Sequence, residues 1–276
     1  MRKRILSYIS DTSVKVAVPH IFRRPLLDVS PSTPLTQLAT FLAIGPQIYV
    51  DGLAVTYDKK PVGRIGSKHI LNYANSHKSF EWTNISASDL MDSEIKSIEA
   101  DASLRELMII FGRTRFAFIP VTVRDEIMTA ISIRDLLPLI ADTGLAGSSK
   151  LISSQIVSCS ADTNLKDIIN LMLSRNIRNI VVRHENETSV INDRKILEFL
   201  FSPDVRMMFT KGKELADINV GVLDLCSVSV MVDDLAISEA AKMLTSVATP
   251  FLLFEDSILS PWDVVMKTSG KDFLIW

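Results

Sequence analysis

The sequence is poor in the residues that several common kinds of functional site require. It has only 10 glycines among 276 residues, which argues against Gly-rich phosphate loops and against a many-turned all-β fold. No GxGxxG, Walker or GxSxG motif is present. The four histidines are scattered, and Cys159 and Cys226 stand alone, without zinc-ligand spacing or a disulfide framework. We therefore expect a protein that is not an enzyme and that requires no metal or cofactor.

The chain also lacks an excess of either charge and a long hydrophobic run. Thirty basic residues stand against 32 acidic ones, so no overall charge points to nucleic acid. Six basic residues lie within the first 24 positions, but no aromatic pattern accompanies them, which leaves nucleic-acid binding a weak alternative. The longest uncharged run, 29–50, contains Pro31, Pro34 and Pro46 and cannot span a bilayer as a regular helix. We expect a cytoplasmic protein with no membrane partner.

What the sequence does contain is one pattern repeated four times. Each copy has apolar residues at i, i+3, i+4 and i+7, the spacing of one helical face, and an N-cap residue is expected three positions before it. The four sets are Leu35/Leu38/Ala39/Leu42, Leu104/Leu107/Met108/Phe111, Leu165/Ile168/Ile169/Met172 and Ile237/Ala240/Ala241/Leu244, with expected caps Ser32, Asp101, Asp162 and Asp234.

Each helical set is followed by a short β-rich run, a polar turn and a second short strand that leads into a second helix. With a short strand before the first helix, the unit is β-α-β-β-α and about 60 residues long, which predicts a mixed α/β (α+β) fold. One unit cannot cover both faces of its sheet, so units should pair. The linker-like stretch 141–150 predicts one pair over 1–143, with units at about 18–78 and 84–143, and a second over 150–276, with units at about 150–203 and 217–276.

The most complete copy of the pattern is the second unit. Its informative segments are Asp89–Met91, Ile95–Ile98, Asp101–Leu104, Ile119–Val121 and Ile131–Leu137, and the third unit repeats the middle part as Asn176–Ile180. These segments resemble the cystathionine-β-synthase (CBS) domain family, and four copies in register extend the resemblance over nearly the whole chain. Two CBS pairs (Bateman modules) in one chain are similar in plan to the gamma subunits of AMP-activated protein kinase. The resemblance implies a non-catalytic regulatory protein whose paired repeats bind AMP, ADP, ATP or S-adenosylmethionine.

The motif Ser-x-x-Asp occurs twice where the last strand of a unit meets its last helix. The intact copies are Ser132–Asp135 and Ser260–Asp263, whereas the first unit has Gly66 and His69 and the third has Asn192 and Lys195. The resemblance to CBS domains implies that the Asp accepts hydrogen bonds from ribose hydroxyls. It also implies that the Ser hydroxyl and the N–H groups of the helix start bind phosphate. The same motif is also close to a capping box, in which both side chains only tie off the helix start, and Pro261 suits that alternative.

Other binding residues follow from the same resemblance. Adenine is expected against the short first strand, near 95–97 or 228–230, and arginines near the second motif are expected to bind phosphate. For any one arginine, a solvated rim is the alternative. Arg194 and Lys195 are expected to reach toward the fourth unit's site if the pair is pseudo-twofold. The predicted binding residues are Ser132, Arg134, Asp135, Ile95, Lys96, Ser97, Arg113, Arg115, Ser260, Asp263, Trp262 and Ser229.

A function from a different class also fits the degenerate first and third units. Both binding sites could have decayed, leaving a ligand-free scaffold that mediates protein–protein interaction. The partner in either case is open between a second copy of the chain and another protein, besides the adenine nucleotide itself.

Overall fold

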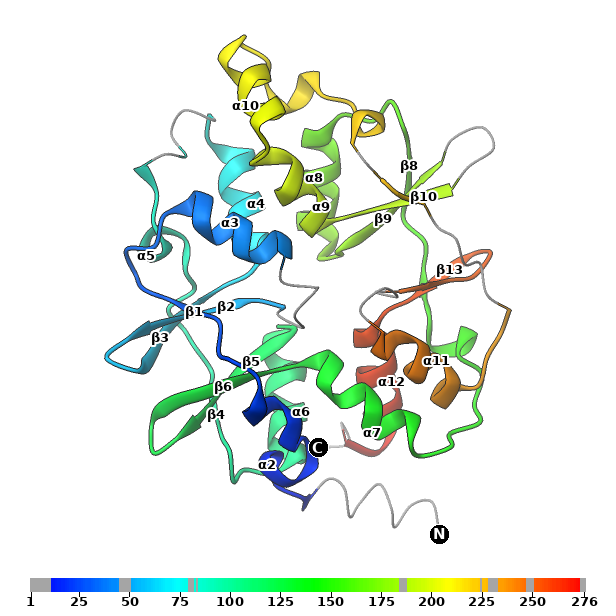
Figure 1. Cartoon of the computed structure of the whole chain (residues 1–276). Helices are drawn as coiled ribbons and strands as arrows, with labels where there is room; N and C mark the ends of the chain where they lie inside the picture. Colours follow the sequence, from blue (N-terminus) through cyan, green and yellow to red (C-terminus); the bar gives the residue numbers. More distant parts are fainter. Residues whose placement is uncertain are drawn as a thin grey trace.

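The computed structural model describes residues 11–44, 51–78, 82, 84–183, 188–223, 225–227, 233–246 and 251–273 (Figure 1). The first two units have the predicted order of elements. Unit one comprises β1 (Asp28–Val29), α3 (Leu35–Ile44), β2 (Leu53–Tyr57), β3 (Lys60–Ile65) and α4 (Ser67–Ser76). Unit two comprises β4 (Ile98–Glu99), α6 (Leu104–Thr114), β5 (Phe118–Val123), β6 (Glu126–Ser132) and a last helix made of η4 (Ile133–Leu136) and α7 (Leu137–Ala141).

Units three and four follow the same plan, which confirms the predicted α/β fold class. Unit three comprises β8 (Ser158–Ser160), α8 (Leu165–Arg175), β9 (Asn179–Arg183), β10 (Thr188–Asn192) and α9 (Asp193–Leu200). Unit four comprises α11 (Ile237–Thr245), β12 (Leu252–Leu253), β13 (Ser257–Leu259) and α12 (Pro261–Phe273). The connecting elements are α2 (Val14–Ala17), η1 (Pro19–Arg23), α5 (Ala87–Leu90), η5 (Lys150–Ile152), β7 (Ser154–Gln155), α10 (Pro203–Thr210), η6 (Leu215–Asp217), η7 (Val220–Val222) and β11 (Cys226–Ser227).

The small sheets of units one to three are built alike. The first strand runs parallel to the second, because a helix connects them, and the second and third form an antiparallel hairpin. The hairpins of the first two units turn on Asp58–Lys59 and Arg124–Asp125, all four with positive φ, as a two-residue type I′ turn requires. The expected first strand of unit four falls mostly on residues outside the described ranges.

The helices begin at the predicted apolar residues, but the predicted N-caps are wrong by two positions. Helices α6, α8 and α11 are preceded by Ser103, Asn164 and Ala236 as caps, and the first two accept a backbone N–H three residues on. The carboxylate of Asp101 instead pairs with Lys15, and that of Asp234 accepts the backbone N–H of Lys150 at 3.0 Å. The first apolar residue of each set is already the first residue of its helix, so the N-cap is the residue directly before it and not the one three positions before.

Neighbouring units exchange short edge segments. Strand β7, which precedes unit three, pairs with β13 of unit four, and β11, which follows unit three, pairs with β10 of unit three. In the first half of the chain, Asp92 bridges to Arg64 of β3, and the segment 11–24 lies on unit two. Each exchange places the residues that precede one unit against the sheet of its neighbour, where they become part of any site formed there.

Helices from opposite halves of the chain form the main hydrophobic cores. One core joins α3 and α4 to α8 and α9, thus units one and three, and the other joins α6 and α7 to α11 and α12, thus units two and four. Figure 1 shows the first helix group in its upper half and the second in its lower half. A smaller core, Val181, Val190 and Leu253, joins the sheets of units three and four. Within the described ranges, no helix is both long enough and apolar enough to cross a membrane.

Candidate functional site

Ser132 and Asp135 lie at the junction of β6 and η4, as the motif predicts, and both are buried. The backbone N–H of Ser132 donates to Oδ2 of Asp135 at 2.7 Å, and Oγ of Ser132 accepts the N–H of Arg134 at 3.2 Å. These are the contacts of a capped helix start. They occupy only part of the hydrogen-bonding capacity of the Asp135 carboxylate, so its ligand role depends on its other neighbours.

Those other neighbours come from the N-terminal segment. Nη1 of Arg24 donates to Oδ1 of Asp135 at 2.9 Å and Nη2 donates to Oδ2 at 2.6 Å, a two-pronged ion pair, and Nη2 also donates to the carbonyl of Ala130 at 2.7 Å. Nε2 of His20 lies 3.4 Å from Oδ1. Both oxygens of Asp135 are therefore engaged by protein groups.

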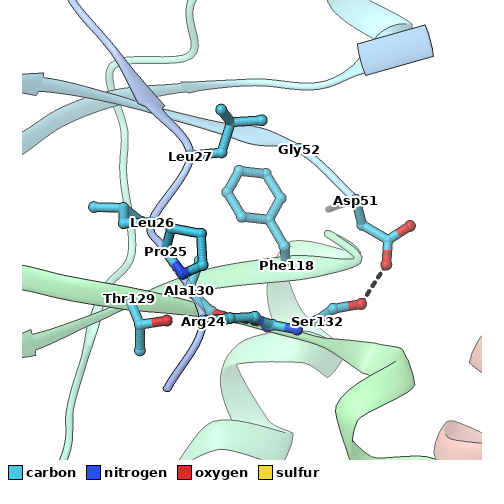
Figure 2. A pocket seen from close by; sticks show the side chains of 10 residues that line it. All are labelled: Arg24, Pro25, Leu26, Leu27, Asp51, Gly52, Phe118, Thr129, Ala130 and Ser132. Atoms are coloured by element: carbon cyan, nitrogen blue, oxygen red, sulfur yellow. Dashed lines mark hydrogen bonds between the residues drawn. The ribbon is translucent and has the colours of Figure 1, made fainter. Parts of the chain in front are cut away.

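A pocket of only about 20 Å³ adjoins this ion pair, enough for little more than one water molecule. Figure 2 shows the ring of Phe118 pointing toward Gly52, with Asp51 hydrogen-bonded to Ser132 beside it. Its lining residues are Arg24, Pro25, Leu26, Leu27, Asp51, Gly52, Phe118, Thr129, Ala130 and Ser132. In this arrangement the pocket cannot hold a nucleotide.

The second motif is closed in a similar way. Oδ2 of Asp263 accepts the N–H of Ser260 at 3.0 Å and its hydroxyl at 2.6 Å, which completes the capping contacts. Oδ1 accepts the hydroxyl of Ser154 at 2.7 Å and lies 2.9 Å from Nζ of Lys267, one turn along the same helix. Ser154 belongs to the exchanged strand β7, so this carboxylate, too, is bound by the segment that precedes its paired unit.

A much larger cavity, of about 530 Å³, lies where units one, two and three meet. We call it the central cavity. Its volume falls in the range typical of small-molecule sites. It is lined by Asp51, Arg64, Gly66, Ser67, Lys68, His69, Leu71, Asn72, Thr114, Arg115, Phe116, Ala117, Phe118, Met172, Leu173, Asn176, Ile177, Arg178 and Asp193. Four cationic side chains and two carboxylates are among them, and one of the cations, Arg64, also pairs with Asp92 outside the lining, which leaves an excess of one positive charge.

Two buried polar atoms of the central cavity lack a hydrogen-bond partner within the described structure: Nη1 of Arg64 and Oγ of Ser67. Both residues are 3% exposed, and Ser67 is the first residue of α4. The other guanidinium nitrogens of Arg64 donate to Asp92, with Nη2–Oδ2 at 2.5 Å, and the group stacks on Phe116. Because a buried donor without a partner is costly, this corner of the cavity is suited to an acceptor from outside the protein.

Burial also changes the titration of the cavity's polar groups. Desolvation lowers the pKa of Arg64, against the raising effect of Asp92, and lowers the pKa of His69. His69 is therefore neutral near pH 7, with its Nδ1 accepting the N–H of Gly66 at 2.9 Å. The positive character of the cavity thus comes from arginine and lysine.

A network of ion pairs forms the wall between the small pocket and the central cavity. Asp51 accepts hydrogen bonds from Ser132 of unit two and from Nη1 of Arg178 of unit three, the latter at 3.3 Å. Arg178 also binds Asp193, with Nε–Oδ2 at 2.9 Å. Burial alone raises the pKa of Asp51, but Arg178 and then Arg194 outweigh it, so the pKa is lowered. Desolvation, followed by the charge of Arg178, lowers the pKa of Arg194 to about 10.

Comparison with known proteins identifies the repeats. The family model for the CBS domain matches residues 87–142 and 149–202, which are units two and three. Units two and three of this chain are CBS domains. The predicted family is therefore confirmed. No curated protein sequence matches the chain.

One solved structure shares the fold of most of the chain, and others match about half of it. A protein of Methanocaldococcus jannaschii, described as a candidate archaeal homologue of the γ subunit of AMP-activated protein kinase, is 15% identical with a TM-score of 0.75, over 89% of this chain and 96% of that one. CBS-domain proteins of Agrobacterium tumefaciens and Thermotoga maritima are each 20% identical with TM-scores of 0.40; they cover 46% and 48% of this chain and 98% and 96% of their own. The archaeal likeness shows that the two proteins share one fold over 89% of this chain.

In every unit, the residue two positions after the motif start contacts the C-terminal part of the first helix of another unit. That other unit is the one with which it shares a hydrophobic core. Arg134 donates to the carbonyl of Ser246 at 3.1 Å, beyond the end of α11, and Trp262 meets Phe111 edge-to-face at 6.4 Å between ring centroids. The corresponding contacts of units one and three are Lys68 Nζ to Asn176 Oδ1 and Arg194 Nη1 to the carbonyl of Leu42. The expectation that Arg194 reaches unit four is wrong, since it reaches unit one, and Lys195 pairs with Glu198.

The remaining predicted residues are dispersed. Ile95, Lys96 and Ser97 precede β4 and line neither cavity, because the segment adjoining Asp135 is 24–27 instead. Arg113 is exposed in the last turn of α6, whereas Arg115, its left-handed C-cap, lines the central cavity. Ser229 lies outside the described residues. The structure thus brings Ser132 and Asp135 together, and separates them from 95–97 and from Arg113.

The sequence-based set missed the residues that give both cavities their character: Arg24, Asp51, Arg64, Lys68 and Arg178. None lies in an intact Ser-x-x-Asp motif. The register of the repeats gave a signal for Lys68, which is equivalent to Arg134 of unit two, but not for Arg178, which is equivalent to Ala117. In the described part of the chain, no group of three or more His, Cys, Asp or Glu side chains is arranged to hold a metal ion.

Proposed function

We propose that this CBS protein is a non-catalytic sensor that binds an adenine nucleotide in the central cavity. The observation that carries the proposal is the pair of buried donors without partners, Arg64 Nη1 and Ser67 Oγ, inside a cavity of about 530 Å³ with excess positive charge. An anionic group that reached either donor would supply the missing acceptor, and arginine and the start of α4 are well suited to phosphate oxygens.

The rest of the lining supports a ligand with an apolar part. Met172, Leu173 and Ile177 of unit three and Phe118 of unit two supply apolar surface in the same cavity. An adenine ring fits such surface, and the CBS resemblance implies an adenosine-containing ligand. The archaeal structure's description as a candidate γ-subunit homologue agrees with this choice.

The charge of the cavity ranks the four ligands that the resemblance implies. ATP, ADP and AMP carry negative phosphates, whereas S-adenosylmethionine carries a sulfonium cation. The excess of positive charge therefore favours the nucleotides, in the order of their phosphate charge. Because the lining comes from three units, a bound nucleotide affects the contact between the two halves of the chain. A partner protein that binds one arrangement of the halves more tightly would respond to that change.

The test is isothermal titration of the full-length chain with AMP, ADP, ATP and S-adenosylmethionine. We expect one nucleotide per central cavity, and an affinity of this site about tenfold lower in Arg115→Gln, the typical effect of losing one charge-assisted contact. Arg113→Gln is the matched control, since it removes the same charge two residues away, outside the cavity.

Two results would count against the proposal. Absence of binding heat and of a thermal shift with all four compounds at millimolar concentration excludes the sensor and favours the ligand-free scaffold. Equal losses in Arg113→Gln and Arg115→Gln show a long-range charge effect and exclude the central cavity as the site.

A further inference from the structure

Arg24 occupies Asp135 in the way that a bound ligand would. Its guanidinium reaches both carboxylate oxygens at 2.9 and 2.6 Å and the carbonyl of Ala130 at 2.7 Å, so every hydrogen-bonding direction around this face of the carboxylate is used. The Asp135 side chain is 3% exposed, whereas that of Arg24 is 23% exposed. Access to Asp135 from the pocket therefore requires Arg24 to move.

The segment that carries Arg24 is packed against unit two through the residues that precede Arg24. Val14, Val18 and Ile21 are completely buried in the core of units two and four, and the hydroxyl of Thr129 donates to the carbonyl of Ile21 at 2.9 Å. Arg24 itself lies beyond η1 with extended backbone, before β1 begins at Asp28. Its long side chain can thus leave Asp135 while residues 14–21 stay in place.

The cation that pairs with Asp135 differs in origin from the cation that pairs with Asp263 in the other intact motif. There the cation beside Asp263 is Lys267 of the same helix, whose Nζ also donates to the carbonyl of Ser153 at 3.1 Å and to Oγ of Ser154 at 2.9 Å. Arg24, in contrast, is part of the lining of the 20 Å³ pocket, together with Pro25, Leu26 and Leu27. The cation at Asp135 therefore comes from a distant segment that lines a pocket, whereas the cation at Asp263 comes from the helix of the carboxylate itself.

A ligand that displaces Arg24 from Asp135 must compensate the charges of both side chains. A neutral diol that replaces the guanidinium leaves the buried Asp135 carboxylate without its counter-charge and the partly exposed Arg24 without its ion pair, which is unfavourable. An occupant that offers hydroxyl donors to Asp135 and an anionic group to Arg24 replaces both partners at once. We infer that Arg24 is an internal ligand that closes the Asp135 site, so that this site accepts a phosphorylated sugar compound such as a nucleotide and rejects the corresponding neutral nucleoside. This second site extends the proposed function and does not depend on a ligand in the central cavity.

The test compares adenosine with AMP in the full-length chain, by isothermal titration, for wild type, Arg24→Met and the double variant Arg24→Met/Asp135→Asn. Wild type should not bind adenosine measurably at this site. Arg24→Met should bind adenosine at least about 30-fold more tightly, the change expected when a competing buried charge pair is removed, and the double variant should lose that binding. The matched control is Arg23→Met, because Arg23 is the neighbouring arginine and is exposed. This variant should behave as wild type.

The stability of the variants is measured alongside, because Arg24→Met leaves the Asp135 carboxylate without its cation. If it does not fold, Arg24→Lys replaces it: the charge remains but the two-pronged contact is lost, and adenosine should bind between wild type and the expectation for Met. Folded variants that bind no more adenosine than wild type overturn the inference, as does a wild type that binds adenosine through Asp135. A chain that binds no nucleotide in the central cavity, yet gains adenosine binding in Arg24→Met, refutes only the proposed function.

Discussion

Adding one methyl group at Gly52 should disrupt the wall between the small pocket and the central cavity. A Cβ atom at this position would lie 1.9 Å from Cε1 of Phe118, and 2.3 and 2.7 Å from two further ring atoms. The ring cannot simply turn away, because Phe118 is 5% exposed and starts β5. Gly52→Ala must therefore shift the ring, the strand or both.

The size of the effect follows from this overlap. Forcing one methyl group into a packed interior costs about 1–3 kcal/mol of the free energy of unfolding, which in a chain of this size lowers Tm by about 3–10 °C. Phe118→Ala removes all the overlapping ring atoms, Cδ1 included, and by itself costs about 3–5 kcal/mol. In the double variant the methyl group has room, so the double variant should be more stable than the sum of the two single changes by about 1 kcal/mol or more.

The assay is urea and thermal unfolding of wild type, both single variants and the double variant. Gly66→Ala is the control, because a Cβ there has only Nδ1 of His69 nearby, at 3.9 Å, and its backbone φ of −124° accepts alanine. The reasoning is refuted if Gly52→Ala unfolds within about 0.5 kcal/mol of wild type, the spread of neutral surface changes, or if the two single effects simply add.

Further outcomes follow from the ion pairs. The pKa of Asp51 is lowered in the folded chain, so its charge stabilises the fold above the unfolded value near 3.9 and this contribution disappears as the pH falls below it. Asp51→Asn should therefore be less stable than wild type by about 1–3 kcal/mol at pH 7, with the gap closing below about pH 4, in urea unfolding at several pH values; a gap independent of pH contradicts this. Arg134→Met should lose about 1–3 kcal/mol of stability, since it removes the bonds to the carbonyls of Leu244 and Ser246, while nucleotide affinity in titration calorimetry changes by less than about twofold. A large loss of affinity without a loss of stability would instead make Arg134 a ligand-binding residue.

Much of the fold followed from local pattern. The spacing Leu104, Leu107, Met108, Phe111 places four residues on one helical face, and the structure buries all four in a single helix. The start of that helix was misplaced because Asp101 and Ser103 are both good caps by residue type. Only the position of Leu104 at the edge of the core decides between them, and that position is set by packing.

The candidate site was less accessible to the same reasoning. Ser132 and Asp135 were found because their contacts are local, three residues apart. Arg24, which decides whether Asp135 is open, lies 111 residues away in sequence, and no periodicity or motif links the two positions. The edge exchange between units brings them together, and it arises from the need of each sheet to pair its edge.

The sequence by itself therefore determined the repeated β-α-β-β-α unit, its fourfold copy number and the helix-start motifs, because these depend on side-chain periodicity and on contacts within a few residues. Only the tertiary structure decided which units share a core, which cation faces each carboxylate and where a cavity remains. Those features depend on how four similar units pack, and similar units carry no local signal for their neighbours. The two buried donors of Arg64 and Ser67 became meaningful only when units two and three closed a cavity over them.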